Sequence, residues 1–310
     1  MTGFAQILAE RVESYITLRR SLGYLFAHEA TILRALVRYV DSHRLDGPLT
    51  QKMGINFATA WNGSANGRAI RYGVVRRFAD YLAIYDSQTE AFDPKALPRS
   101  RAVPPPRILS DTELTALMSA CRSVSPNYPG RALVLAPLVG LLASTGLRSG
   151  EALRLDRADV DLASGVLSIR KTKFRKDRLV PVHPTTRTAL CSYARRRDRV
   201  YPAPKDQAFF LSSRGNRLSA TGLRTAFAAA RQRAGLVGDR ALRPHDLRHR
   251  FAVTRLVTWH QEQADVQALL PVLATYLGHS RYSDTAYYVH ATAELLGMAA
   301  ERTGVDGGGA

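Results

Sequence analysis

Apolar residues recur at helical spacing along most of this chain, and they predict a mainly helical protein. In the N-terminal part they fall three or four residues apart in three separate segments. The segments contain Leu8, Val12, Tyr15, Ile16 and Leu22; Ile32, Leu33, Leu36, Val37 and Val40; and Val74, Val75, Phe78, Tyr81 and Leu82. Gly23, the turn at residues 62–64 and Gly67 separate them. A small bundle of about four helices is expected.

The C-terminal part combines helical segments with a short hairpin. Ser110 followed by Glu113 is the capping-box arrangement for a helix start, and an apolar helix is predicted from about Ala132. Residues 165–170 and 178–182 predict two short strands around a basic turn. Further helices are expected to begin near Pro184, Ser219, Pro244, Ala264 and Ser283. The predicted fold class is mainly α with a small antiparallel sheet.

A proline-rich stretch divides the chain. Residues 93–107 contain five prolines, and proline fixes φ and cannot continue a helix. We therefore expect a helical N-terminal domain, a linker, a larger C-terminal domain and a flexible glycine-rich tail. The expected boundaries are 1–92, 93–108, 109–303 and 304–310.

The net positive charge of the chain indicates a polyanionic partner. The chain carries 44 Lys and Arg against 26 Asp and Glu, a net charge of +18, distributed as +6 on residues 1–108 and +12 on residues 109–310. So large an excess is self-repulsive unless a polyanion meets it, which makes nucleic acid the first partner to consider and an anionic membrane the second. The longest uncharged stretch, residues 132–147, is too short for a membrane span and contains Pro137. No membrane partner is expected.

Neither cysteines nor acidic clusters predict a metal or a cofactor. Cys121 and Cys191 lie far apart without a C-x-x-C pair, which favours reduced thiols in a cytoplasmic protein. The chain has no Walker-type Gly-Lys-Ser/Thr run.

Four polar clusters in the C-terminal part suggest chemistry on a phosphate. Arg148, two residues after the helix-ending Gly146, would place a forked guanidinium on a tight turn that Glu151 braces. In the turn at residues 170–178, six of nine residues are basic. Taken alone, the first feature is more typical of a surface arginine near a helix cap, and the alternative for the second is a solvated, strongly charged hairpin.

The other two clusters contain histidines. His245 and Arg248, three residues apart, would share one face of a helix. The fourth cluster runs from Leu277-Gly278-His279 to His290 and includes Tyr287 and Tyr288. Taken alone, the first of these clusters is also consistent with two ordinary polar residues on a helix. The second is also consistent with an amphipathic segment whose aromatic rings are buried.

The order of the four clusters resembles the tyrosine recombinase (phage integrase) family. Residues 172–181 are similar to the family's lysine hairpin and place its catalytic lysine on Lys173. Leu277-Gly278-His279 resembles the L-G-H box, nine residues before the nucleophile, which selects Tyr288 over Tyr287. Residues 15–40 and 75–82 are similar to the family's core-binding domain.

This resemblance implies an N-terminal helical core-binding (SAM-like) bundle that binds DNA and an α+β catalytic domain. It also implies a site-specific recombinase that works without cofactor or metal through a 3′-phosphotyrosyl intermediate. In it, two arginines would clamp the scissile phosphate, one histidine would help accept the tyrosine proton, the second would hydrogen-bond the phosphate, and the lysine would protonate the leaving 5′-hydroxyl. The implied catalytic residues are Arg148, Lys173, His245, Arg248, His279 and Tyr288.

The partners implied are double-stranded DNA, a homo-tetramer assembled on two DNA sites, and an accessory recombinase or DNA-bending protein. Residues 291–302 would form a helix that docks on a neighbouring protomer or on its own domain. We expect a cytoplasmic, nucleoid-associated bacterial protein, encoded by a mobile element. Two other functions stay open: a type IB topoisomerase-like enzyme, and a DNA-binding regulator that has lost catalysis.

Overall fold

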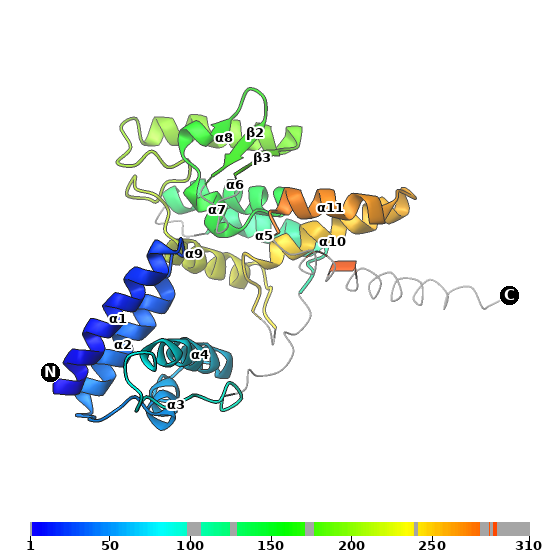
Figure 1. Cartoon of the computed structure of the whole chain (residues 1–310). Coiled ribbons are helices and arrows are strands. Elements are labelled where there is room, and N and C mark those ends of the chain that lie inside the picture. Colours follow the sequence, from blue (N-terminus) through cyan, green and yellow to red (C-terminus); the bar gives the residue numbers. More distant parts are fainter. Residues whose placement is uncertain are drawn as a thin grey trace. The chain divides into compact units, whose positions relative to one another are not determined.

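The chain folds into two compact units, Met1–Pro104 and Pro105–Ala310, in the computed structural model (Figure 1). The division falls within the proline-rich stretch. Most of the expected linker, the segment 291–302 and the tail lie outside the residues that the structure describes. Those described are 2–97, 107–124, 129–170, 177–238, 241–279, 285, 288 and 289.

The described part of the first unit is a bundle of helices built from the predicted apolar segments. Hydroxyl side chains of Thr2, Thr50 and Ser64 accept main-chain N–H groups at three helix starts, as N-caps do. Apolar faces from all the helices meet in one core, which includes Leu36 and Phe78. The helices are α1 (Gly3–Ser21), α2 (Ala27–Ser42), α3 (Gln51–Thr59) and α4 (Ala65–Leu82).

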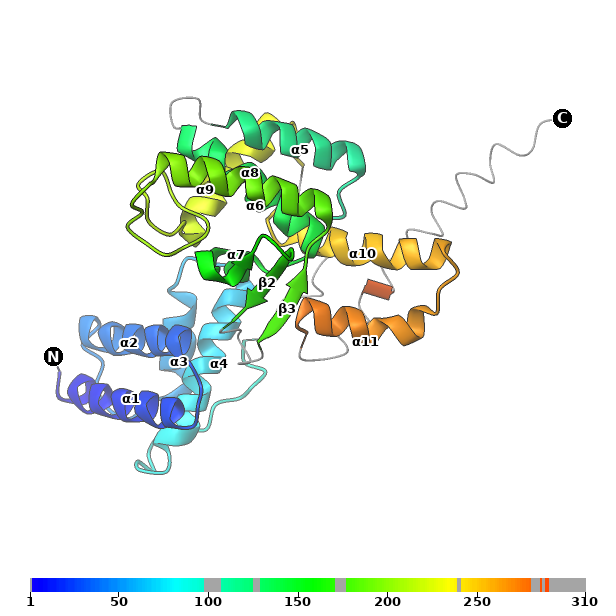
Figure 2. The ribbon, with the colours of Figure 1, turned by 90° about the horizontal axis from the view of Figure 1, so that it is seen from above.

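The second unit is built around the apolar helix α6 (Pro129–Thr145). Leu135, Leu138 and Leu142 on this helix are fully buried, and such helices are typical of protein cores. No helix among the described residues is both long and apolar enough to cross a membrane. The helices packed on α6 are α5 (Asp111–Ser123), α8 (Pro184–Val200), α9 (Ala220–Arg233) and α10 (Asp246–Gln261) (Figure 2). α5 begins with the predicted capping box.

A small antiparallel sheet of order β1-β2-β3 completes this unit, and its hairpin was predicted. Leu167 on the central strand pairs with Val160 on one side and with Val180 on the other. The first strand was not predicted, because two residues are too few to show an alternating pattern. The turn with Lys173 lies outside the described residues. The strands are β1 (Val160–Asp161), which follows the 3-10 helix η1 (Arg157–Asp159), β2 (Val166–Ile169) and β3 (Arg178–Pro181).

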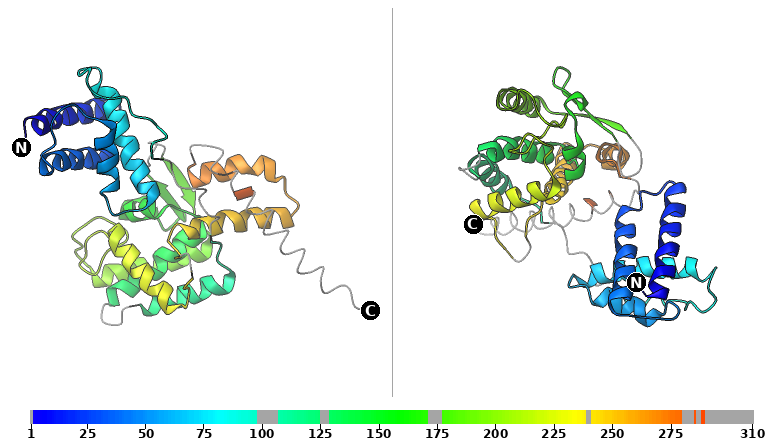
Figure 3. Two further views of the ribbon diagram at one scale, coloured as in Figure 1. Left: turned by 90° about the horizontal axis from the view of Figure 1, so that it is seen from below. Right: turned by 90° about the vertical axis from the view of Figure 1, so that its left-hand side faces the viewer.

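The last described elements form a helical pair. α11 (Val266–Leu277) runs beside α10, and the short piece at residues 288–289, drawn in red, packs against both helices (Figures 2 and 3). Tyr288 packs there in a cluster with Leu256 and Leu273. The fold therefore brings the end of the described chain back onto α10.

The end of α6 allows a test of this packing. Gly146 has φ +62°, and a Cβ there would lie 2.6 Å from Phe251 Cδ1 and 2.9 Å from Leu277 Cδ2. Gly146→Ala is therefore expected to lose about 2–5 kcal/mol of unfolding free energy, from left-handed strain and overpacking together. Gly235 is the matched control, because it has φ +69° and open space around the Cβ position.

Gly235→Ala should lose only the strain, about 1–2 kcal/mol. Urea unfolding followed by circular dichroism measures both variants. Equal losses in the two variants would contradict the tight packing around Gly146.

Candidate active site

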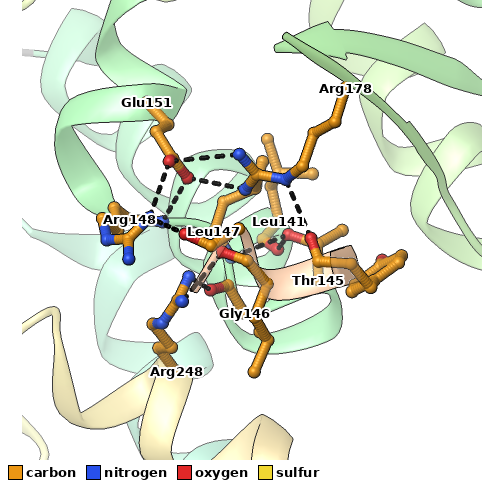
Figure 4. A network of polar contacts seen from close by, with 11 residues as sticks. Leu141, Thr145, Gly146, Leu147, Arg148, Glu151, Arg178 and Arg248 are labelled. Carbon is orange, nitrogen blue, oxygen red and sulfur yellow. Dashed lines mark hydrogen bonds and ion pairs between the residues drawn. The ribbon is translucent and has the colours of Figure 1, made fainter. Parts of the chain in front are cut away.

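The turn between α6 and α7 (Ser149–Arg154) carries Arg148. Gly146 adopts the left-handed conformation that lets the chain reverse after Thr145. The Thr145 hydroxyl donates to Leu141 O at 2.6 Å and accepts the Leu147 N–H at 3.4 Å. The guanidinium of Arg148 is thus mounted on a short, internally bonded turn, as the sequence predicted (Figure 4).

Glu151 braces this turn from one side. Its carboxylate accepts hydrogen bonds from the main-chain N–H and from Nη1 of Arg148, each at 3.1 Å, as the predicted bracing role requires. The same carboxylate accepts hydrogen bonds from both terminal nitrogens of Arg178 on β3, at 2.9 and 3.2 Å (Figure 4). Burial acts to raise the pKa of Glu151, but the hydrogen bonds and charge of Arg178 outweigh it, so its pKa is lowered. The group is an ionised carboxylate shared by two arginines.

The end of α11 is tied to the same turn through its main chain. Arg178 Nε donates to Tyr276 O at 2.8 Å, and Arg148 Nη1 donates to Gly278 O at 3.0 Å. The main chain at Gly278 also lies close to the Arg178 side chain, because a Cβ at this position would be 2.7 Å from Arg178 Nη1. Side chains from β3 and the α6–α7 turn therefore fix the position of the residues next to His279.

Arg248 approaches the turn from α10 and is almost completely buried, with 1% of its surface exposed. Its Nη1 donates to Gly146 O and its Nη2 to Leu277 O, both at 2.8 Å. Burial lowers the pKa of Arg248 to about 10, with a further contribution from the charge of Arg148. The guanidinium is therefore still protonated at neutral pH.

Two histidines lie directly against Tyr288. The His279 ring is stacked on the tyrosine ring, with centroids 6.1 Å apart, and its Nδ1 is 2.7 Å from the Thr285 hydroxyl. The Tyr288 hydroxyl lies 3.0 Å from Nδ1 of His249 on α10. His245 packs edge-to-face on His249 with centroids 4.7 Å apart.

All three histidines are held neutral by their surroundings. Burial lowers the pKa of His249 to about 4, with His245 adding to the effect. Burial and then the charge of Arg248 lower the pKa of His279 to about 3, and the same two causes lower the pKa of His245. At neutral pH each ring therefore has one nitrogen able to accept a proton and one able to donate.

The local charge favours an anion. Three guanidinium groups lie at this turn with one carboxylate: Arg148 and Arg178 bond Glu151, and Arg248 bonds the Gly146 carbonyl. A phosphate placed beside Arg148 and Arg248 would meet several N–H donors in a fixed geometry. Among the described residues, no group of three or more His, Cys, Asp or Glu side chains is arranged to hold a metal ion.

Comparison with known proteins decides the family. The sequence pattern of the phage integrase family matches residues 107–294. Integrase/recombinase y4rE of Sinorhizobium fredii is 64% identical over 310 residues, which cover both chains completely. Tyrosine recombinase XerC of Pelotomaculum thermopropionicum is 35% identical over 197 residues, 62% of this chain and 59% of that one. The chain belongs to the tyrosine recombinases of the phage integrase family.

The fold agrees with this family. The structure of the Tn1549 transposon integrase in complex with transposon right end DNA has a TM-score of 0.64 to this chain, at 16% sequence identity. The alignment covers 92% of this recombinase and 97% of that integrase chain. It therefore includes both the helical first unit and the second unit with its small sheet.

In this recombinase, five of the six site residues expected from the sequence lie around the ends of α6, α10 and α11. The sixth, Lys173, lies outside the described residues. Three further contacts were not foreseen: Arg178 on Glu151, His249 on Tyr288 and Thr285 on His279. In the sequence Arg178 is one of six basic residues in the hairpin turn, and only its place at the start of a predicted strand sets it apart. The residues brought together are Arg148, His245, Arg248, His279 and Tyr288.

The ion pair between Arg178 and Glu151 predicts a large loss of stability on substitution. Their side chains are 11% and 2% exposed, and Arg178→Met would leave a buried carboxylate with one of its two arginines gone. We expect a loss of about 3–5 kcal/mol of unfolding free energy, measured by urea titration. Glu151→Gln introduced together with Arg178→Met should recover part of it, because the carboxylate that lost its partner is then replaced by an uncharged amide.

Arg170→Met is the matched control. The Arg170 side chain, directly after β2, pairs with Asp159 at the end of η1 but is 60% exposed, so its loss should cost less than about 1 kcal/mol. Similar losses for Arg170→Met and Arg178→Met would contradict the structural role given to the buried pair.

Proposed function

We propose that this recombinase cuts and rejoins double-stranded DNA at specific sites through a 3′-phosphotyrosyl intermediate. The observation that carries the proposal is the meeting of Arg148, Arg248 and Tyr288 at the junction of three helix ends. A phosphodiester is already anionic and gains charge in the transition state, so its cleavage depends mainly on fixed positive groups. The site supplies such groups beside a hydroxyl nucleophile.

Arg148 and Arg248 bind the non-bridging oxygens of the scissile phosphate in this scheme. Arg248 uses Nη1 and Nη2 to hold main-chain carbonyls, and a guanidinium has three further N–H donors to offer. His279 donates a hydrogen bond to the same phosphate. With the Thr285 hydroxyl donating to Nδ1, the neutral His279 ring carries its proton on Nε2, where it is available.

Proton transfer completes the reaction. Tyr288 attacks the phosphorus, His245 helps to accept its proton, and Lys173 protonates the leaving 5′-oxygen as general acid. The phosphotyrosyl bond conserves the energy of the phosphodiester, so rejoining is the same step in reverse. The scheme therefore requires no nucleotide, other cofactor or metal ion.

Residues 1–92 act in this proposal as a second DNA-binding domain, linked by residues 93–108 to a catalytic domain at 109–303. Guanidinium groups stacked on aromatic rings support it. Arg71 lies 4.2 Å from the Phe57 ring centroid, and Arg19 lies 4.2 Å from that of Tyr24. Such stacking orients a cation while leaving N–H groups available for phosphates.

We propose the biological setting in more general terms than the reaction. The 64% identical relative is named an integrase/recombinase, which supports a role in a mobile element of a bacterial genome. We further propose a homo-tetramer on two DNA sites, helped by an accessory recombinase or a DNA-bending protein, in the nucleoid-containing cytoplasm. Sequencing the DNA that flanks the gene in independent isolates tests this setting, because a mobile element leaves defined ends at different positions.

The nucleophile can be tested directly. The probe is a duplex selected by binding to this chain from a random-sequence library, then nicked close to the cleavage position so that a cut strand cannot rejoin. The wild-type chain should accumulate a covalent protein–DNA adduct visible on a denaturing gel, and Tyr288→Phe should form none. Tyr287→Phe is the control, since the neighbouring hydroxyl is the nearest rival, and it should form the adduct normally.

The alternatives give different results in the same assay. An adduct with Tyr288→Phe would refute the assignment of the nucleophile. A DNA-binding regulator without catalysis would bind the selected duplex and give no adduct with the wild-type chain. A topoisomerase-like enzyme would relax supercoiled plasmid that lacks the selected site, whereas a site-specific recombinase would not.

A further inference from the structure

The hydroxyl oxygen of Tyr288 already has an imidazole partner in the DNA-free protein. His249 Nδ1 lies 3.0 Å from it, and the two rings are 5.6 Å apart at an interplanar angle of 54°. Tyr288 is 3% exposed, so bulk water has little access to the phenol. His249 follows Arg248 directly on α10, which fixes the imidazole relative to the guanidinium of the phosphate site.

The state of His249 suits an acceptor of the phenolic proton. Burial lowers the pKa of His249 to about 4, with His245 as the next cause, so the ring is neutral at pH 7. With its proton on Nε2, Nδ1 presents a lone pair to the Tyr288 hydroxyl. The positive charge of Arg248 also lowers the pKa of His249, and an anionic phosphate bound beside that arginine would oppose this effect. DNA binding would therefore make His249 a stronger base.

We propose that His249 is the group that directly takes the Tyr288 proton during DNA cleavage, an inference that rests on the proposed function. As the bond from Tyr288 Oη to phosphorus forms, the bond from phosphorus to the 5′-oxygen breaks. The phenolic proton passes to His249 Nδ1, and the leaving 5′-oxygen takes a proton from the general acid. In the rejoining step the same proton returns from His249 to Tyr288.

Neighbouring groups stabilise the imidazolium that this step creates. Asp246, the first residue of α10, is completely buried, and its charge raises the pKa of both His245 and His249. Its carboxylate accepts the Arg243 N–H at 2.7 Å, which holds it in place. His245 packs on the ring of His249, and its help in proton acceptance then consists of supporting that ring.

Chemical rescue tests the proposal in the full-length chain with the nicked selected duplex. His249→Ala should slow single-turnover adduct formation a hundredfold or more, the range of a general base. Added imidazole should restore the rate in proportion to its concentration, and more basic substituted imidazoles should restore it further. His249→Asn keeps a hydrogen-bond acceptor near the Nδ1 position but cannot take the proton, so it should fold normally and remain slow.

His260→Ala is the matched control, because His260 is an exposed residue at the end of the same helix, and this variant should react at the wild-type rate. Wild-type rates in His249→Ala or His249→Asn would overturn the inference. A slow His249→Ala that imidazole does not restore would also overturn it, because a packing role alone gives that result. Failure of the proposed function is seen separately, as a wild-type adduct that is absent or independent of Tyr288.

Discussion

The buried guanidinium of Arg248 is the group on which the arrangement of the site depends. It joins the carbonyl after the end of α6 to the last carbonyl of α11, with hydrogen bonds of 2.8 Å to both. Removing such an ion from water costs several kcal/mol. Each hydrogen bond from a charged donor stabilises the folded state by about 1.5–3 kcal/mol. The negative end of each helix dipole contributes at most about 2 kcal/mol more. These gains offset most of the cost: burial still lowers the pKa of Arg248, to about 10, but the group stays protonated at neutral pH.

The same arrangement explains why positive charge is left over for a ligand. Glu151 is held by Arg178 from β3 and by Arg148 from the turn, so one carboxylate serves two guanidinium groups. Arg248 is held by main-chain carbonyls, which are polar but carry no net charge. The three arginines and Glu151 therefore leave an excess of two positive charges at the helix ends. That excess matches the charge which a phosphodiester develops as it is attacked.

Features encoded by nearby residues could be predicted from the sequence, and features formed by distant residues could not. The capping box of Ser110 and Glu113 and the β2–β3 hairpin each depend on short spacings, and the structure contains both. The contact of Arg178 with Tyr276 joins residues 98 positions apart, and that of His249 with Tyr288 spans 39 positions. No periodicity or local motif records such pairs. The order of the four polar clusters indicated the family without showing which side chains meet.

Arg248 is a buried, charged group that is already fixed at two helix ends before DNA arrives. Nitrogen-15 NMR of arginine side chains in the DNA-free protein measures this most directly, with the Arg248 signals assigned from Arg248→Lys. We expect separate Nη1 and Nη2 signals with slowly exchanging protons, unchanged from about pH 6 to about pH 8 because the group stays protonated over this range. A single averaged signal with rapid proton exchange, like that expected for the exposed Arg170, would contradict it.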